Sequence, residues 1–250
     1  MLVLLLGLAF GSLANALVWR IHKDMPVVKD RSKCIHCKHI LAWYDLIPIL
    51  SWLMLRGKCR YCKKNISWQY PVVELTTAVL FLAFYLVFDP SSTKEWIQLS
   101  LWFIQITGLM VLLVYDARWK LLPNVVTFPL LTIAIIQVII SGTYIDSLIG
   151  AGIGAGFFGF IYLISKGKWI GDGDIVLGAI FGLLLGASKS LLCLLIGFYS
   201  AAIFILPLMA MKKLNRKSQI PFGPFLILGI FVSALWGNSL VDYLGTWLGL

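Results

Sequence analysis

The sequence predicts an all-α polytopic membrane protein with about eight transmembrane helices and a small cytoplasmic insert between the first and the second. Hydrophobic residues make up 60% of the 250 residues, the mean hydropathy is +0.91, and only 13% of the residues are charged. Apolar runs of about 17 to 25 residues, long enough to cross ~30 Å of hydrocarbon, recur along the chain. One polar stretch, residues 20–70, interrupts them.

The apolar runs define the expected spans, near residues 1–19, 71–88, 97–115, 124–141, 147–165, 174–188, 190–211 and 223–247. The first run is expected to be a retained helix, because no basic residue precedes it and no small-residue cleavage site follows its core. The sequence therefore divides into a first transmembrane helix at 1–19, an insert at 20–70 and a seven-helix membrane domain at 71–250.

The basic residues predict the orientation of these spans. Of the 21 Lys and Arg residues, all but Lys94 and Lys189 lie on one side of the expected spans. Basic residues gather on the cytoplasmic side of membrane proteins, which places residues 20–70 in the cytoplasm and both termini outside. Because topology accounts for most of the net charge of +10, no nucleic-acid partner is expected.

The insert carries two CxxC pairs, Cys34 with Cys37 and Cys59 with Cys62. Two close pairs of thiolates suit tetrahedral Zn²⁺, so a zinc site with these four cysteines as ligands is expected. Haem c attachment would require His after the second cysteine, whereas Lys38 and Lys63 follow here. Disulfides are disfavoured in a reducing cytoplasm, but a membrane thiol oxidoreductase that uses the CxxC pairs remains an alternative.

Several other residues of these types have a simpler structural interpretation. His36 and His39 lie beside the cysteines and are expected to be surface histidines, with replacement of one cysteine as a metal ligand as the alternative. Cys193 is expected to be a buried small hydrophobe. In "GIGAGFFGF" a dinucleotide fingerprint would need a preceding strand. Small residues four apart instead favour close helix packing, and two such pairs are present, Gly150 with Gly154 and Gly152 with Gly156.

Two aspartates stand at the expected cytoplasmic ends of spans. Asp116 ends the apolar run 101–115, and Asp174 follows "WIGDG" at the start of another run. Acids near membrane depth are expensive and are functional candidates. An aspartate at a helix start can also cap backbone amides, which explains Asp174 structurally. The same dipole disfavours Asp116 at a helix end, so something else must favour it.

A pair of carboxylates brought together across helices supplies such a reason. Like charges at short range do not both ionise easily, so the pair can share a proton and offer one acid and one base. The base deprotonates water and the acid protonates the peptide carbonyl, as in aspartic proteases. Gly171 and Gly173 are expected to support this loop by letting a substrate approach and by adopting unusual backbone angles.

Only one of the two acids in "GDGD" is expected to face Asp116. Residues two apart on a helix point about 200° away from each other, so Asp172 and Asp174 do not both face one neighbour. Asp174 adjoins the apolar run, whereas Asp172 is expected further into the loop, where an acid is solvated or helps steer a basic substrate.

The sequence resembles the prepilin peptidase family (type IV leader peptidases), which belongs with the GxGD-type intramembrane aspartyl proteases. The segment "FGSLANALVWR" at 10–20 is similar to the family's FGSFLNVVIYR, and the CxxC pairs flank a DxIPxLSW stretch at 45–52. The stretches "ISWQYPVVEL", which ends at Leu75, and "IPFGPFLILG" at 220–229 also resemble family motifs.

The resemblance implies an activity, a location and a catalytic pair. It implies cleavage of the short basic leader of type IV prepilins or pseudopilins at the cytoplasmic face of the bacterial inner membrane, with Asp116 and Asp174 as the catalytic aspartates. The family often has Lys two positions after the second aspartate, where Val176 stands here, which puts any role of that Lys in doubt.

The resemblance also implies a second activity. Members with the cysteine-bearing insert are commonly N-methyltransferases that use S-adenosylmethionine. Glu74, an acid just after the insert, is the candidate for binding this donor, with a structural boundary acid as the alternative. A carboxylate-dependent ion transporter would also need acids in the membrane, but it leaves the paired cysteines unexplained.

Overall fold

The computed structural model describes residues 1–26, 31–212 and 220–248. Within these ranges the ordered elements are helices, and β-structure is limited to two isolated bridges, Lys33 with Ile40 and Lys58 with Asn65. The predicted all-α class is therefore confirmed. The chain forms two compact units, Met1–Val111 and Leu112–Leu250, and the boundary between them in the sequence falls within helix α4 (Thr93–Trp119). The expected division at residues 19 and 70 stays a prediction.

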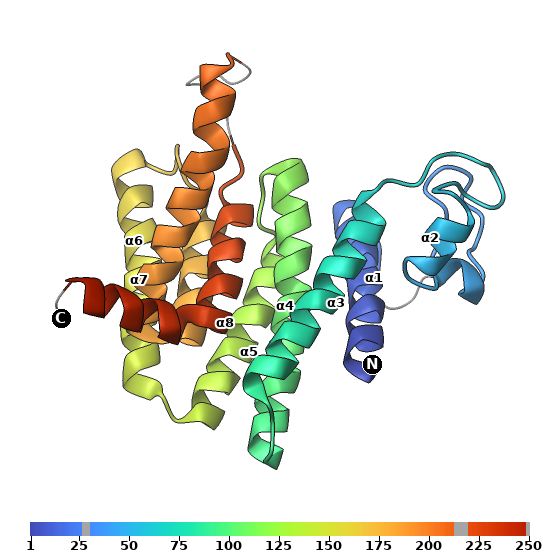
Figure 1. The fold of residues 1–250 in the computed structure, drawn as a ribbon. Helices are drawn as coiled ribbons and strands as arrows, with labels where there is room; N and C mark the ends of the chain where they lie inside the picture. The colour runs from blue at the N-terminus through green and yellow to red at the C-terminus, as the bar shows by residue number, and fades with distance from the viewer. Residues whose placement is uncertain (27–30, 213–219, 249–250) are drawn as a thin grey trace. The chain divides into compact units, whose positions relative to one another are not determined.

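The first unit contains two long helices that pack side by side, α1 and α3 (Figure 1). Glycines on α1 allow this close contact, because a Cβ at Gly7 would lie 2.5 Å from the Cα of Ala78 and one at Gly11 would lie 2.6 Å from the Cα of Glu74. Small residues commonly serve this purpose between membrane helices. The elements are α1 (Leu2–His22), the 3₁₀ helix η1 (Trp43–Leu46), α2 (Leu50–Met54), α3 (Gln69–Phe88) and α4 (Thr93–Trp119) up to Val111.

The second unit is built on a close contact between α6 and α7. A Cβ at Gly150 would clash with the backbone of Gly182, and one at Gly154 would clash with that of Gly178. Nothing lies within 4 Å of a Cβ built on Gly152 or Gly156, so only one of the two expected glycine pairs serves packing. The elements are the end of α4, α5 (Asn124–Ser141), α6 (Tyr144–Ser165), α7 (Asp172–Ala210) and α8 (Gly223–Leu248).

Helix α7 includes both apolar runs that were expected as separate spans, 174–188 and 190–211. Its backbone is non-helical at Gly186, with φ 77° and ψ −177°, a conformation largely restricted to glycine. The rings of Phe158 and Phe181 lie 6.5 Å apart and those of Phe157 and Phe198 lie 5.6 Å apart. Residues 181 and 198 would be separated by ~25 Å along a straight helix, so α7 reverses direction at Gly186.

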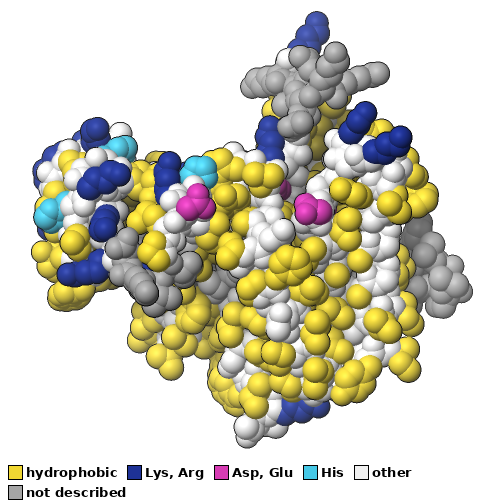
Figure 2. All heavy atoms as spheres, turned by 180° about the vertical axis from the view of Figure 1, so that it is seen from behind, with side chains coloured by type: hydrophobic (Ala, Val, Ile, Leu, Met, Phe, Trp, Pro, Cys, Tyr) yellow, Lys and Arg dark blue, Asp and Glu magenta, His cyan; other side chains and the backbone are white. Residues whose placement is uncertain are grey.

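The described residues contain seven helices that are long and apolar enough to cross a membrane, namely α1 and α3 to α8. This confirms a polytopic membrane protein. The expected number was about eight because two of the expected spans, 174–188 and 190–211, both lie in α7. Hydrophobic side chains cover much of the helix sides (Figure 2). Large apolar residues such as Ile145, Leu163 and Ile203 are more than 70% exposed, which suits contact with lipid.

Candidate active site and metal centre

Asp116 lies in the last turn of α4 and is buried, with 6% of its surface exposed. Its Oδ2 accepts a hydrogen bond of 2.9 Å from the backbone N–H of Gly223, the first residue of α8. The positive end of the α8 dipole therefore compensates for the unfavourable end of α4. A Cβ at Gly223 would lie 2.6 Å from the same oxygen, so this contact requires glycine.

Asp174 lies in the first turn of α7, together with Asp172. Helix α7 begins at Asp172 with Gly171 as its N-cap, so the expectation that Asp172 lies further into the loop is wrong. The Asp174 Oδ2 accepts a hydrogen bond of 3.2 Å from the Gly171 N–H, and the Asp172 Oδ1 accepts one of 3.0 Å from the Gly173 N–H. Asp174 is half-buried, whereas Asp172 is exposed.

The second unit brings Asp116 and Asp174 together. Their carboxylates lie close enough for the charges to interact. A Cβ at Gly173 would lie 2.7 Å from the Cβ of Leu122, so this glycine lets the start of α7 pack against the connection between α4 and α5. Gly171 has φ −80° and ψ 162°, which many residues adopt, so the unusual backbone expected there is not found.

The four cysteines of the insert converge in the first unit. Their sulfur atoms all lie within 4.8 Å of one another, and the sulfurs of Cys34 and Cys62 are 3.9 Å apart. All four are free thiols. Tetrahedral Zn²⁺ with Zn–S bonds of about 2.3 Å separates its sulfurs by about 3.8 Å, so this cluster fits a zinc ion.

Two equivalent turns present the cysteines. In the first turn, the Cys34 N–H donates to the His39 carbonyl (2.9 Å) and the Lys38 N–H donates to the Cys34 carbonyl (3.0 Å). Cys59 makes the same two bonds with Lys64 and Lys63 at the same distances. The similarity follows from a repeat at a spacing of 25 residues, "RSKCIHCKHI" and "RGKCRYCKKN". Sequence reasoning noted the paired cysteines but not this repeat.

The turns also set the electrostatics of the thiols. Burial alone would raise the pKa of the Cys34 thiol, but hydrogen bonds from the Cys37 and His36 backbone amides outweigh it and lower the pKa to about 7. The ring of His39 lies 3.7 Å from that of Tyr61. Both His36 and His39 are exposed and lie outside the cysteine cluster, as expected.

Asp45 ties η1 to the second cysteine turn. Its Oδ1 accepts a hydrogen bond of 2.7 Å from the Arg60 Nε, and its Oδ2 accepts bonds from the Tyr61 hydroxyl (3.0 Å) and the Ala42 N–H (3.2 Å). Burial alone would raise the pKa of Asp45, but these hydrogen bonds outweigh it and hold the pKa below its usual value. Sequence analysis had noted Asp45 only as part of a family motif.

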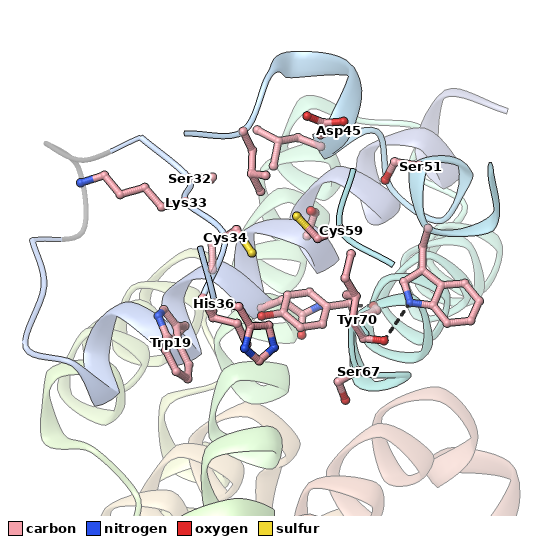
Figure 3. Close-up of a pocket in the computed structure, with 18 of the residues that line it drawn as sticks. Trp19, Ser32, Lys33, Cys34, His36, Asp45, Ser51, Cys59, Ser67 and Tyr70 are labelled. Carbon is pink, nitrogen blue, oxygen red and sulfur yellow. Dashed lines mark hydrogen bonds between the residues drawn. The ribbon is translucent and has the colours of Figure 1, made fainter. Parts of the chain in front are cut away.

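Glu74 lies in the wall of a cavity of about 650 Å³ in the first unit. Figure 3 shows this cavity with other lining residues labelled, among them Trp19 and Tyr70. It is buried, with 6% of its surface exposed. Its Oε2 accepts a hydrogen bond of 2.7 Å from the Ile49 N–H, and the Ser12 hydroxyl also bonds to its carboxylate. The sequence predicts Glu74 only as a structural boundary acid or as a residue that binds the methyl donor. In the structure its hydrogen bonds join α1, α3 and the insert.

The long apolar helices, together with the carboxylates of Asp116 and Asp174, are typical of a polytopic membrane enzyme. The model for the bacterial peptidase A24 N-terminal domain matches residues 5–88, and that for the type IV leader peptidase family matches residues 103–206. Prepilin leader peptidase/N-methyltransferases of Bacillus subtilis (strain 168) and Legionella pneumophila are 30% and 31% identical to the chain. The alignments cover 97% and 98% of this chain and 96% and 94% of those relatives.

A relative of the same name from Aeromonas salmonicida (strain A449) is 31% identical over 98% of this chain and 94% of its own length. No solved structure matches the chain. The chain therefore belongs to the type IV leader peptidase family. This placement gives no support to the thiol oxidoreductase and ion transporter alternatives.

Proposed function

We propose that this protein removes the basic leader peptide from type IV prepilins or pseudopilins, with Asp116 and Asp174 as its catalytic pair. The observation that carries the proposal is the convergence of two carboxylates from α4 and α7, one of them buried. The relatives are named prepilin leader peptidases, which supports this substrate class.

The geometry suits a general acid–base mechanism. One oxygen of Asp116 is held by the Gly223 N–H and one oxygen of Asp174 by the Gly171 N–H, which leaves the other oxygen of each for substrate and water. The ionised aspartate takes a proton from water, and the resulting hydroxide attacks the peptide carbonyl. The protonated aspartate gives its proton to the carbonyl oxygen. As the C–N bond breaks, the first aspartate passes the proton it took from water to the leaving nitrogen, and the hydroxyl proton returns to the second aspartate as the C=O bond re-forms.

We propose that the same chain also methylates the new N-terminus, because the relatives are also named N-methyltransferases. S-adenosylmethionine supplies an electrophilic methyl group. The lone pair of the substrate amine forms the new C–N bond, the C–S bonding pair stays on sulfur, and the amine proton passes to water.

The four cysteines are proposed to hold a structural Zn²⁺. Their convergence and free thiols support this role, and four protein ligands close the coordination sphere, as in structural rather than catalytic zinc sites. The ion would join the two cysteine turns and keep the insert folded beside α1 and α3.

We propose that the insert and the catalytic pair face the cytoplasm, with both termini outside. Counting α7 as two spans gives eight crossings. A cysteine-reactive reagent that does not cross membranes should label Gly142→Cys on intact cells, but Lys64→Cys and Lys212→Cys only after the membrane is opened. Cells with no introduced cysteine provide the background. Labelling of Lys64→Cys and Lys212→Cys from opposite faces would contradict this topology.

The decisive test of the proposed function is incubation of the purified protein with a prepilin peptide. Mass spectrometry should find a single cut after the leader and, with S-adenosylmethionine added, an increase of one methyl group. Redox turnover of the cysteines without cleavage would favour the oxidoreductase, and ion flux in vesicles without cleavage would favour the transporter.

A further inference from the structure

The short helix α2 of the insert presents an exposed apolar side. Ser51 and Trp52 line the cavity, whereas the opposite side of the helix carries Leu50, Leu53 and Met54, each more than half exposed. Their spacing of i, i+3 and i+4 places these three on one side of the helix.

The neighbouring helix η1 adds a further apolar side chain to this side of the insert. Trp43 is 76% exposed, and η1 contacts α2. We call Trp43, Leu50, Leu53 and Met54 the outer patch. Single exposed hydrophobes are common on protein surfaces, but a group of large ones marks an interaction surface.

Hydrogen bonds fix the depth of α2 along α1 and α3. The residue before α2, Ile49, donates its N–H to the Glu74 carboxylate at 2.7 Å, and the Ser12 hydroxyl bonds to the same carboxylate. Ser12 precedes Trp19 by seven residues on α1, and Glu74 follows Trp68, the N-cap of α3, by six. At 1.5 Å per residue, these offsets along the two helix axes are ~10 Å and ~9 Å.

Trp19 and Trp68 mark the level at which α1 and α3 leave the apolar layer. Arg20 follows Trp19 directly, and Trp gathers at membrane–water interfaces. By either offset, α2 begins about 9 to 10 Å on the membrane side of this level. Figure 1 shows α2 beside α1 and α3 rather than beyond their ends. Amphipathic helices that lie in a membrane surface bury their apolar face by about 5–10 Å, which matches this depth.

The backbone that connects η1 to α2 is strained. Ile49 has φ 59° and ψ −52°, a conformation that a β-branched residue adopts only where its surroundings impose it. The imposing contact is the hydrogen bond from the Ile49 N–H to Glu74. This contact therefore holds α2 at its depth beside the membrane helices.

The charge of the insert decides which partner suits the outer patch. Residues 31–68 contain eight Lys and Arg residues and one acid, Asp45, which is paired with Arg60. Arg56 and Lys58 follow α2 and are exposed, and Figure 2 shows Lys and Arg side chains spread over the insert. Anionic lipid headgroups attract such residues. A second copy of this chain, or the basic leader proposed as substrate, carries like charge and would be repelled.

We propose that the outer patch docks into the anionic lipid surface of the membrane that α1 and α3 cross. The four apolar side chains lie among the headgroups and the upper acyl chains, and Arg56 and Lys58 meet the lipid phosphates. The bilayer thus holds the insert in addition to the cysteine cluster. This docking does not depend on which peptide the enzyme cleaves.

Depth-dependent quenching of a fluorescent label tests the contact. Met54→Cys carries the label in the outer patch, and Lys64→Cys, at an exposed charged position of the second cysteine turn, is the matched control. The purified full chain, zinc retained, is placed in nanodiscs of phosphatidylcholine and phosphatidylglycerol. The wild-type chain treated with the same reagent gives the background from its own cysteines.

The two labels should respond oppositely to the two kinds of quencher. Lipids that carry a nitroxide near the top of the acyl chain should quench the label on Met54→Cys at least about threefold more than the label on Lys64→Cys. Iodide in the water should quench the label on Lys64→Cys more strongly.

A charge placed in the outer patch tests the same contact without a label. Leu53→Glu opposes both apolar burial and the attraction to anionic lipid, whereas Leu53→Met keeps an apolar side chain. In nanodiscs with phosphatidylglycerol, hydrogen exchange of residues 43–54 should be at least about threefold faster in Leu53→Glu than in the wild type or Leu53→Met. The difference should shrink when phosphatidylcholine replaces phosphatidylglycerol. Equal zinc content shows that the insert is folded in each variant.

Several results would overturn the proposal. Equal quenching of both labels by the nitroxide lipids would show that the outer patch lies in water. A label on Met54→Cys shielded from both quenchers would show that protein covers the patch. Unchanged exchange in Leu53→Glu with zinc retained would contradict the docking, and an equal difference in both lipids would contradict the role of anionic headgroups.

Discussion

Asp172 and Asp174 occupy the same helical turn but differ in their surroundings. Asp174 is half-buried and its charge acts on Asp116, whereas Asp172 is exposed and accepts a hydrogen bond from the Gly173 N–H. We predict that Asp174→Asn abolishes prepilin cleavage, because asparagine keeps the size but cannot cycle a proton. Asp172→Asn should keep at least about a tenth of the activity, a loss of no more than about 1.4 kcal/mol of barrier.

The measurement is the initial rate of cleavage in membranes that contain equal amounts of each variant. Asp172→Asn is the matched control, since it makes the same chemical change two residues away. Loss of cleavage in Asp172→Asn together with its survival in Asp174→Asn would refute the assignment of the pair.

A second prediction at the scale of single residues concerns Asp45. Its lowered pKa means that the folded insert binds this proton less tightly than the unfolded insert, so stability is gained above the unfolded pKa and lost only as the pH falls through the lowered value. Asp45→Asn should therefore speed hydrogen exchange in residues 42–61 by the same factor at every pH from 8 to 6. A factor that vanishes within that range would show that the carboxylate is not the cause.

Sequence reasoning identified the acids of the site better than the groups that hold them. Residue type and position at span ends were enough to propose Asp116 and Asp174. The amide of Gly223 lies 107 residues from Asp116 in the sequence, so no local pattern could link them. Gly223 within "IPFGPF" is part of a recognisable motif in the sequence. Its role, which is to donate its backbone N–H to Asp116 without a side chain in the way, follows only from the structure.

At the scale of elements, the insert lacks an apolar core of its own. Among its described residues from 23 to 68, only Cys34, Gly57 and Cys59 are buried, and neither η1 nor α2 contains a buried residue. Hydrophobic burial therefore contributes little, and we expect the metal to supply the folding free energy.

We predict that the purified protein carries about one Zn²⁺ per chain and that Cys59→Ser loses it. Hydrogen exchange should then become fast in the insert, while the membrane helices keep their protection because they pack independently of the sulfurs. Cys193→Ala, which changes the buried cysteine outside the cluster, is the matched control and should keep the metal. Absence of metal together with disulfide-linked thiols would contradict the zinc assignment.

The spans themselves followed closely from hydropathy, because the bilayer requires long apolar runs. The sequence predicts a break between residues 174–188 and 190–211 but does not explain why the chain turns at Gly186. In the structure a Cβ at Gly186 would overlap the Asp146 carboxylate, and the Ala187 N–H donates to the same carboxylate at 3.1 Å. The turn therefore requires glycine and is held by Asp146. The pairing of α6 with α7 through Gly150 and Gly154 could be anticipated only as a preference for small residues, not as a particular partner.

At the scale of the whole molecule, the aspartate pair and the cysteine insert belong to different compact units. The aspartate pair lies in Leu112–Leu250, and the cavity with Glu74 lies in Met1–Val111. Composition and motifs predicted both a protease pair and a cysteine insert. They could not predict the cavity, because it forms where α1, α3 and the insert meet, and these segments are separated by tens of residues.

We predict that the two proposed activities of the chain, methylation and proteolysis, can be uncoupled. Methyl transfer from a sulfonium to an amine needs no proton transfer by the aspartate pair, so Asp116→Asn should block cleavage of a prepilin peptide yet still methylate a peptide that already has the mature N-terminus. Glu74→Gln, at the residue that the sequence suggests for binding the methyl donor, should do the reverse. Mass spectrometry of both peptides with each purified variant measures the two rates. If Asp116→Asn fails on both peptides while it retains zinc and binds S-adenosylhomocysteine normally, the two activities share the aspartates, and the prediction that they can be uncoupled is wrong.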